Sequence, residues 1–152
     1  MKVLFVVKHD PCIQEKAPFI IAQMDLIQKL GVDVSFFPVT GKGLSGYIKS
    51  SCRLRRYLKK NQIDLIHAHY SLCGLTSIVS FPGIPIVVSL MGSDTLGIFK
   101  SVRSITNKSK VVVALTFLMQ PFFSATICKS EHVFRRIYRK KNAEGIPNGV
   151  DL

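Results

Sequence analysis

The chain has 152 residues, of which 47% are hydrophobic, enough for one domain with a buried core and too few for two comfortable ones. It carries 21 Lys and Arg against 9 Asp and Glu, a formal net charge of +12. The composition excludes a disordered chain. The charge favours anionic partners: phosphate-bearing ligands, acidic lipid headgroups or nucleic acid.

The first half of the chain alternates between strand-like and helix-like segments. A β-branched and aromatic run at 3–7 predicts a strand that is covered on both faces. Residues 18–31 predict a helix with Pro18 near its start and Gly31 just past its end. Its apolar positions at helical spacing are Ile20, Met24, Ile27 and Leu30. Residues 32–39 predict the next strand.

The second predicted helix, over 47–61, follows a loop at 40–46 and is strongly basic. A narrow stripe on one side of it consists of Tyr47, Ser51, Leu54 and Leu58. The opposite side carries the candidates for an anion-binding surface: Arg53, Arg55, Arg56, Lys59 and Lys60. A second basic group lies between residues 129 and 141. Each group is either such a surface or an ordinary solvated helix face.

The rest of the chain continues the alternation. Strands are predicted at 64–68, 86–90 and 124–130, and helices at 72–80, within 95–122, where Pro121 limits the last one, and over 131–141 after an N-cap at Ser130. Parallel β-α-β units explain this order. We therefore expect an α/β fold: a doubly wound, mostly parallel Rossmann-like sheet with helices on both faces.

Three features concern the membrane and the compartment. The apolar run at 111–123 is too short to span a bilayer as a helix and predicts a buried core element or, alternatively, an interfacial segment. The N-terminus predicts a strand rather than a signal peptide. The four cysteines, Cys12, Cys52, Cys73 and Cys128, have no C-x-x-C spacing. They indicate reduced thiols in a cytoplasmic protein.

Ligands of such sheets bind beyond the carboxyl ends of the strands, which directs attention to the loops at 8–17, 39–45, 68–74, 90–95 and 128–130. The loop SLMGSDTLG, 89–97, is the most distinctive of these. Gly92 would let the backbone approach a ligand, and Ser93 or Asp94 could cap a following helix. The loop is either a site for an anionic or polyhydroxylic ligand or a simple capped turn.

The segment IHAHYSLCG, 66–74, places His67 and His69 on the same face of a strand, with His69 at its carboxyl end. Three roles are possible for the pair: hydrogen bonding to a polar substrate, a structural role, or the start of a metal site. A metal site needs a third ligand, and no nearby carboxylate pattern supplies one. We therefore expect no metal.

Several familiar motifs are absent from the sequence. The loop after the first strand has no glycine, which argues against an enzyme that uses NAD or FAD. There is no phosphate-binding G-x-x-x-x-G-K-[ST] loop, no G-x-S-x-G elbow and no nucleic-acid-binding module. Nucleic acid is therefore an unlikely partner.

Five ordered blocks nevertheless form a recognisable series: LIQKLGVDVSFF, DLIHAHYSLCGL, PIVVSLMGSDTLG, ATICKSEHV and the final IPNGVDL. In this order they resemble the N-terminal, acceptor-side domain of family-4-type retaining glycosyltransferases of the GT-B fold. The resemblance covers essentially the whole chain. It implies a domain at 1–146 and the start of an interdomain linker at 147–152. It further implies a separate C-terminal domain, or a separate chain, that binds the nucleotide-sugar donor.

The resemblance implies transfer of a sugar, as in hexosyltransferases, to a glycan or lipid-linked acceptor, without a metal or other cofactor. It further implies a location at the membrane, as for many basic N-terminal domains of the family, which here would be its inner face. Half of a cleft cannot supply both the donor site and the geometry for catalysis, so we expect this half to be inactive alone. Alternatives are a non-catalytic basic module that binds anionic membrane surfaces, and a truncated remnant.

The resemblance also implies which residues face the cleft. These candidates are His9, Asp10, His69, Met91, Gly92, Ser93, Asp94 and Asn148. Met91 stands where many members have a histidine that contacts the transferred sugar. EKAPFI, 15–20, stands where members usually have glycines near the donor phosphates. No catalytic residue is assigned.

Overall fold

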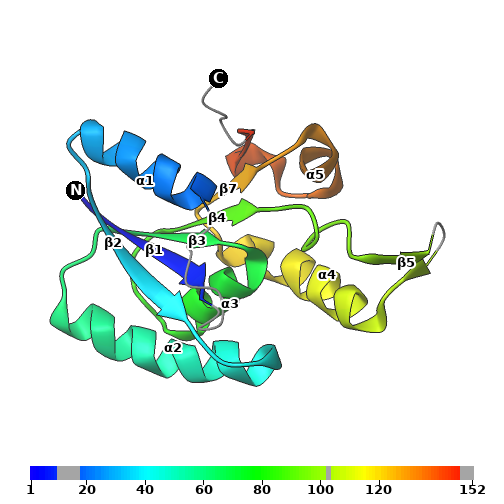
Figure 1. Ribbon diagram of the computed structural model, residues 1–152, viewed down its shortest axis with the longest axis horizontal. Coiled ribbons are helices and arrows are strands. Elements are labelled where there is room, and N and C mark those ends of the chain that lie inside the picture. The colour runs from blue at the N-terminus through cyan, green and yellow to red at the C-terminus, as the bar shows by residue number, and fades with distance from the viewer. Residues whose placement is uncertain (10–17, 102–103, 148–152) are drawn as a thin grey trace.

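The computed structural model describes residues 1–9, 18–101 and 104–147, without the side chains of 99–101 and 104–105. In these residues one six-stranded sheet forms the centre of the molecule, in the order β2-β1-β3-β4-β7-β8 (Figure 1). The strands are β1 (Lys2–Lys8), β2 (Asp33–Val39), β3 (Leu65–His69), β4 (Ile86–Leu90), β7 (Ala125–Cys128) and β8 (Ala143–Gly145). Every neighbouring pair is parallel. From the central β1–β3 pair, β2 is added on one side and β4, β7 and β8 follow on the other. This strand order confirms the doubly wound α/β fold.

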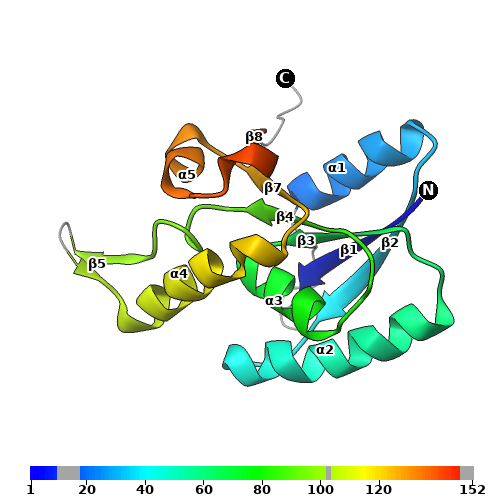
Figure 2. The ribbon, with the colours of Figure 1, turned by 180° about the vertical axis from the view of Figure 1, so that it is seen from behind.

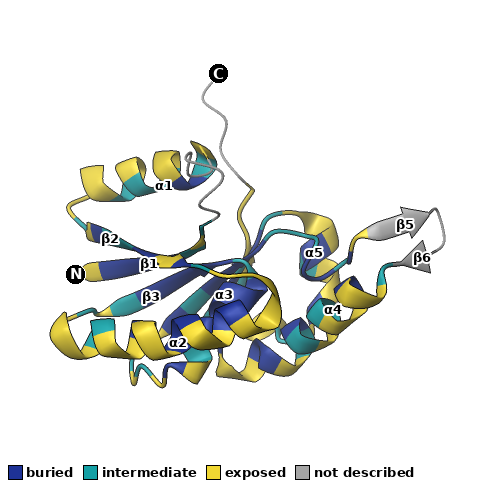
Figure 3. Cartoon of the chain, turned by 60° about the horizontal axis from the view of Figure 1, so that its bottom comes forward, coloured by how far each residue is buried: buried dark blue, intermediate teal, exposed yellow. Residues whose placement is uncertain are grey.

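Helices cover both faces of this sheet (Figures 1 and 2). They are α1 (Pro18–Lys29), α2 (Gly43–Lys60), α3 (Ser71–Val79), α4 (Asn107–Met119) and α5 (Glu131–Arg136). Helix α1 lies over one face, and α2 and α3 lie over the other (Figure 3). The side chains of β1 alternate accordingly. Leu4 and Val6 join the cluster that contains α2 and α3, while Val3 and Phe5 join the one that contains α1.

Five of the six strands of this sheet lie where the sequence predicts them, whereas β8 (Ala143–Gly145) was not predicted, and the other differences concern helix ends. The first helix ends at Lys29, so Leu30 lies outside it and is 82% exposed rather than part of the apolar stripe. Helix α2 begins at Gly43, inside the expected loop at 40–46. The last helix ends at Arg136 instead of continuing to residue 141, and beyond it the backbone N–H groups of Tyr138 and Arg139 donate hydrogen bonds to the Gln120 side chain rather than to the helix.

The segment 95–122 contains a hairpin that was not predicted. Strands β5 (Phe99–Ser101) and β6 (Ser104–Ile105) pair antiparallel before α4 begins. Thr106 caps α4 by accepting a hydrogen bond from the Ser109 N–H at 3.3 Å. Pro121 lies in a short 3₁₀ turn, Gln120–Phe122, and it ends the helix as expected.

The apolar run at 111–123 is only partly a core element. Thr116, Met119 and Phe123 are buried, but Val111, Leu118 and Phe122 are 54%, 70% and 64% exposed. The expectation of a buried segment is therefore wrong for one side of α4. Among the described residues, no helix is long and apolar enough to cross a membrane.

Candidate functional site

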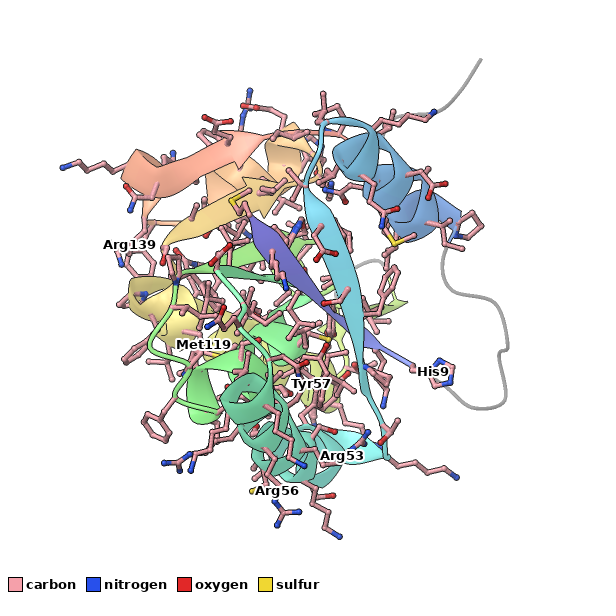
Figure 4. All side chains as sticks on the ribbon, turned by 90° about the vertical axis from the view of Figure 1, so that its left-hand side faces the viewer. His9, Arg53, Arg56, Tyr57, Met119 and Arg139 are labelled. Atoms are coloured by element: carbon pink, nitrogen blue, oxygen red, sulfur yellow. The ribbon has the colours of Figure 1, made fainter. Side chains whose placement is uncertain are left out.

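A cavity of about 820 Å³ opens at the carboxyl ends of β1 and β2. Lys8 and His9 reach it from the end of β1, and Gly41 to Leu44 border it at the start of α2. The first turns of α3 and α4 close the other side. This is the edge where ligands of parallel sheets bind, and the volume suits a small molecule, for which pockets of about 300–1,000 Å³ are typical. Figure 4 shows His9 at the end of β1, one of the predicted cleft residues.

Three exposed lysines, Lys8, Lys42 and Lys108, surround this cavity, and none of its described lining residues is acidic. The Lys8 ammonium donates a hydrogen bond to the Gly41 carbonyl and lies 5.2 Å from the centre of the Tyr47 ring. Lys42 is the N-cap residue of α2, but its side chain takes no part in the cap. The cavity is therefore electropositive.

The wall between these lysines is apolar. It consists of Leu44 and Tyr47 from α2, Leu72 from α3, and Val111 and Val112 from α4. Leu44 and Val111 are 40% and 54% exposed, whereas Tyr47 and Leu72 are buried. Burial raises the pKa of the Tyr47 phenol, so this group stays protonated at neutral pH. The cavity thus has lysine side chains around it and an apolar wall between them.

Asp94, in the loop after β4, is fully buried. Its carboxylate accepts hydrogen bonds from the N–H groups of Met91 at 3.1 Å, Gly92 at 3.0 Å and Ser71 at 3.1 Å. The Ser71 N–H belongs to the first turn of α3, so Asp94 caps α3 from a neighbouring loop. Burial raises the pKa of Asp94, and the backbone N–H groups oppose this rise.

This arrangement corrects the expected role of the loop 89–97. We expected Ser93 or Asp94 to cap the following helix, but no helix begins after them until Asn107 in the described part of the chain. The carboxylate instead joins the loops after β3 and β4. Gly92 has φ +111°, a conformation that favours glycine, and Met91 and Ser93 are half-buried. Asp94 therefore positions this loop.

Tyr70 is a residue that the sequence did not single out. It precedes α3 with φ +89°, rare for a bulky side chain, and its backbone N–H bonds to the Ser89 carbonyl at 2.9 Å. Burial raises the pKa of its phenol, and the Asp94 carboxylate adds to that rise. Only the left-handed backbone distinguishes this residue, and no sequence pattern predicts that conformation for tyrosine.

His67 and His69 share one face of β3, as predicted, and this face packs against Phe5 below α1. The imidazoles stack with 4.3 Å between ring centres, and the Phe5 ring lies 5.0 Å and 4.7 Å from them. Both side chains are buried, at 5% and 2% exposure. Burial lowers the pKa of His67 to about 4 and that of His69 to about 2, with Lys129 contributing to both. Both rings are therefore neutral at physiological pH.

The two histidines differ in their hydrogen bonds. The Nε2 atom of His67 lies 2.8 Å from the Ser89 hydroxyl. Neither ring nitrogen of His69 has a hydrogen-bond partner in the part of the chain that the structure describes. Within that part, no three His, Cys, Asp or Glu side chains converge as a metal site requires.

Two predicted cleft residues, Asp10 and Asn148, lie outside the described residues, as does the linker beyond Pro147. The five basic candidates on α2 are all exposed, and Figure 4 shows two of them, Arg53 and Arg56, on this helix. Arg53 is tied to its surroundings, because its guanidinium bonds to the Thr40 hydroxyl at 2.6 Å and lies 5.6 Å from the centre of the Phe37 ring. It therefore fastens α2 to β2 and is less free than its neighbours to bind an external anion.

A comparison with protein families gives one match over residues 3–152, the model described as Glycosyltransferase Family 4. No curated protein matches the chain closely enough to count as a relative. The match covers nearly the whole chain, including the cavity, the His67–His69 pair and the loop around Asp94.

Proposed function

The chain belongs to Glycosyltransferase Family 4, and from that premise we propose that it is the acceptor-side half of a retaining glycosyltransferase. The complete enzyme would move a sugar from a nucleotide-sugar donor to a glycan or lipid-linked acceptor. The donor would be held by a second Rossmann-like domain, in the same or a separate chain, that faces the carboxyl edge of this sheet. No metal or other cofactor takes part in this proposal.

The observation that carries the proposal is the position of the open cavity. It lies at the carboxyl edge of β1 and β2, and the loop that Asp94 holds is joined by a hydrogen bond to the first turn of α3, which borders the cavity. Ser71, whose N–H bonds to Asp94, directly precedes Leu72, which lines the cavity. The loop with Met91, Gly92 and Ser93 is thereby fixed to the element that borders the cavity, as a site for an acceptor next to the transferred sugar requires.

The chain alone would not catalyse transfer. The groups at the cavity are lysines, a histidine and a buried phenol, which can bind and orient an acceptor. Activation of the nucleotide leaving group requires contacts that a facing domain would provide. We expect the isolated chain to show no hydrolysis of nucleotide sugars, and a clear turnover would contradict this division of roles.

The first test is to read the coding sequence next to this one. We expect a donor-binding domain downstream or in a neighbouring gene. Its absence from both places would favour a remnant of a longer enzyme. A melting comparison between this chain and a longer product of the same gene then shows whether the open edge needs a second domain for stability.

The exposed bases of α2 favour a second function, a module that binds an acidic membrane surface on the cytoplasmic side. Arg55, Arg56, Lys59 and Lys60 lie at the surface of the helix and would attract anionic headgroups over about one Debye length. Co-sedimentation with vesicles of neutral and acidic lipid tests this function. Binding only to acidic vesicles that falls steeply with salt supports it, and equal binding to both kinds contradicts it.

A further inference from the structure

We propose that the cavity between α2 and α4 binds an amphiphilic phosphate, in which a phosphate group is attached to a long apolar chain. The phosphate would lie among Lys8, Lys42 and Lys108, and the apolar chain would lie along α4. That this ligand is the sugar acceptor rests on the proposed function, but its binding to this chain does not.

The three ammonium groups indicate that the ligand carries a negative charge. They come from three separate elements, the end of β1, the start of α2 and the first turn of α4, and they border one cavity whose described lining includes no carboxylate. A phosphate can accept hydrogen bonds from several ammonium groups at once, and such charge-assisted bonds are the stronger ones. Among the described lining residues, no group would balance these positive charges if the ligand were a neutral sugar.

The apolar wall indicates that the ligand also carries a hydrocarbon part. Leu44, Val111 and Val112 would remain in contact with water around a free phosphate ion or a short sugar phosphate. A hydrocarbon chain on the phosphate would cover them, and each buried methylene contributes about 0.8 kcal/mol. The cavity thus favours an anion that carries its own apolar surface.

Helix α4 extends this apolar surface beyond the cavity. Lys108 and Val111 are three residues apart and therefore share one side of the helix, and Leu118 follows two turns after Val111 on the same side. Leu118 and Phe122 are 70% and 64% exposed, and exposed residues continue along α4 in Figure 3. A ligand chain too long for the cavity could continue over this row toward a membrane.

Isothermal titration calorimetry on the 152-residue chain tests the proposal, with decyl phosphate below its micelle-forming concentration as the probe. Inorganic phosphate, uridine diphosphate and decyl glucoside are the comparison ligands. We expect decyl phosphate to bind at least about tenfold more tightly than each of the three, because only it offers both the charge and the apolar chain.

Two sets of variants then locate the binding. The double variant Lys42→Ala/Lys108→Ala should weaken decyl phosphate binding by about tenfold or more, and Val111→Asp should weaken it similarly. The matched control Lys29→Ala/Lys141→Ala removes the same charge at exposed positions outside the cavity and should change binding by less than about twofold. All affected side chains are partly or fully exposed, and melting curves check that each variant is folded.

Three results would overturn the proposal. Equal binding of decyl phosphate to the cavity variants and the parent chain would place the ligand elsewhere. Inorganic phosphate binding as tightly as decyl phosphate would show a plain anion site, and tighter binding of uridine diphosphate would show a nucleotide site.

The proposed function and this inference can fail separately. If decyl phosphate binds as expected but the completed enzyme transfers no sugar, the proposed function fails and this inference stands. If the completed enzyme transfers sugar but the chain does not bind decyl phosphate, this inference fails and the proposed function stands.

Discussion

At the scale of single residues, the acidic and imidazole groups that the sequence highlights are held inside the protein. Asp94 has no exposed surface, and His69 is 2% exposed. Their chemistry is consequently set by their neighbours: three backbone N–H groups for Asp94, and two aromatic rings for His69. Asp94 acts on the site by holding the loop that carries Met91 and Ser93, so we regard it as a positioning residue.

Replacement of Asp94 should therefore be costly for stability. Asp94→Ala leaves three N–H groups without their acceptor, and each buried unsatisfied donor costs roughly 1–3 kcal/mol. We expect a loss of about 3 kcal/mol or more in the free energy of unfolding, measured by urea denaturation. Asp94→Asn, which keeps one acceptor oxygen, should lose less. The exposed Asp25→Ala on α1 is the control and should change stability by less than about 0.5 kcal/mol. An equal effect of both alanine variants would refute this role.

The two buried histidines predict a pH dependence of stability. Their folded-state pKa values, about 4 and about 2, lie below the ordinary value near 6.5, so the unfolded chain binds more protons as the pH falls below about 6.5. The free energy of unfolding should then fall by up to about 1.4 kcal/mol per pH unit for each histidine, and the contribution of His67 should level off near pH 4.

His69→Leu tests this assignment in urea titrations between about pH 7.5 and 4.5, a window that spans the ordinary histidine pKa. As the pH falls, the free energy of unfolding should decrease less steeply for the variant than for the parent chain. At neutral pH it should be at least as stable, because neither ring nitrogen of His69 has a partner among the described residues to lose. The exposed His132→Leu on α5 is the control for replacing a histidine by leucine at the protein surface. A decline in His69→Leu as steep as that of the parent would show that other groups cause it.

At the scale of elements, strands are more predictable than helix ends. Strands β1 and β4 are formed by nearly continuous apolar runs, because both faces of the central sheet are covered. Such runs can be recognised in the local sequence. The end of α5 is accompanied by a contact that is distant in sequence, the hydrogen bonds of the Gln120 side chain to Tyr138 and Arg139, which no local pattern contains. The start of α2 involves a close approach of Gly41 and Gly46 within one short segment. The loops at 8–17, 39–45 and 68–74 were predicted to border a site and do line the cavity, but its α4 side, with Lys108, Val111 and Val112, was not predicted.

The Gly41–Gly46 contact gives a prediction for the element that borders the cavity. A Cβ atom at Gly46 would lie 2.7 Å from the Gly41 carbonyl carbon, and backbone atoms cannot give way as a flexible side chain can. Gly46→Ala should destabilise the protein by about 1–3 kcal/mol in urea denaturation and weaken decyl phosphate binding, because the loop before α2 must move. Gly145→Ala in β8 is the control, since nothing lies within 4 Å of its Cβ position. Equal stability of both variants would contradict the tight approach.

At the scale of the whole molecule, the sequence is sufficient for the fold and the family. The order of alternating segments predicts the doubly wound sheet, and the five blocks predict the glycosyltransferase match over residues 3–152. The one-sided exposure of α4 was not predictable, because from Val111 onward the helix is almost entirely apolar and gives no clear periodicity to show which side is covered. That side adjoins the cavity at Val111, and for this reason we connect the apolar surface with the ligand.

The most direct test of the proposed function is reconstitution of sugar transfer. The chain is combined with a donor-binding domain identified in the adjacent coding sequence, a set of radiolabelled nucleotide sugars and a lipid extract of its own cells, and labelled acceptor is counted. We predict product only when both protein parts are present, and less product when Lys42→Ala/Lys108→Ala replaces the parent chain. Product from either part alone, or none from the combined parts with any donor, would contradict the proposal that this domain is the acceptor half of a glycosyltransferase.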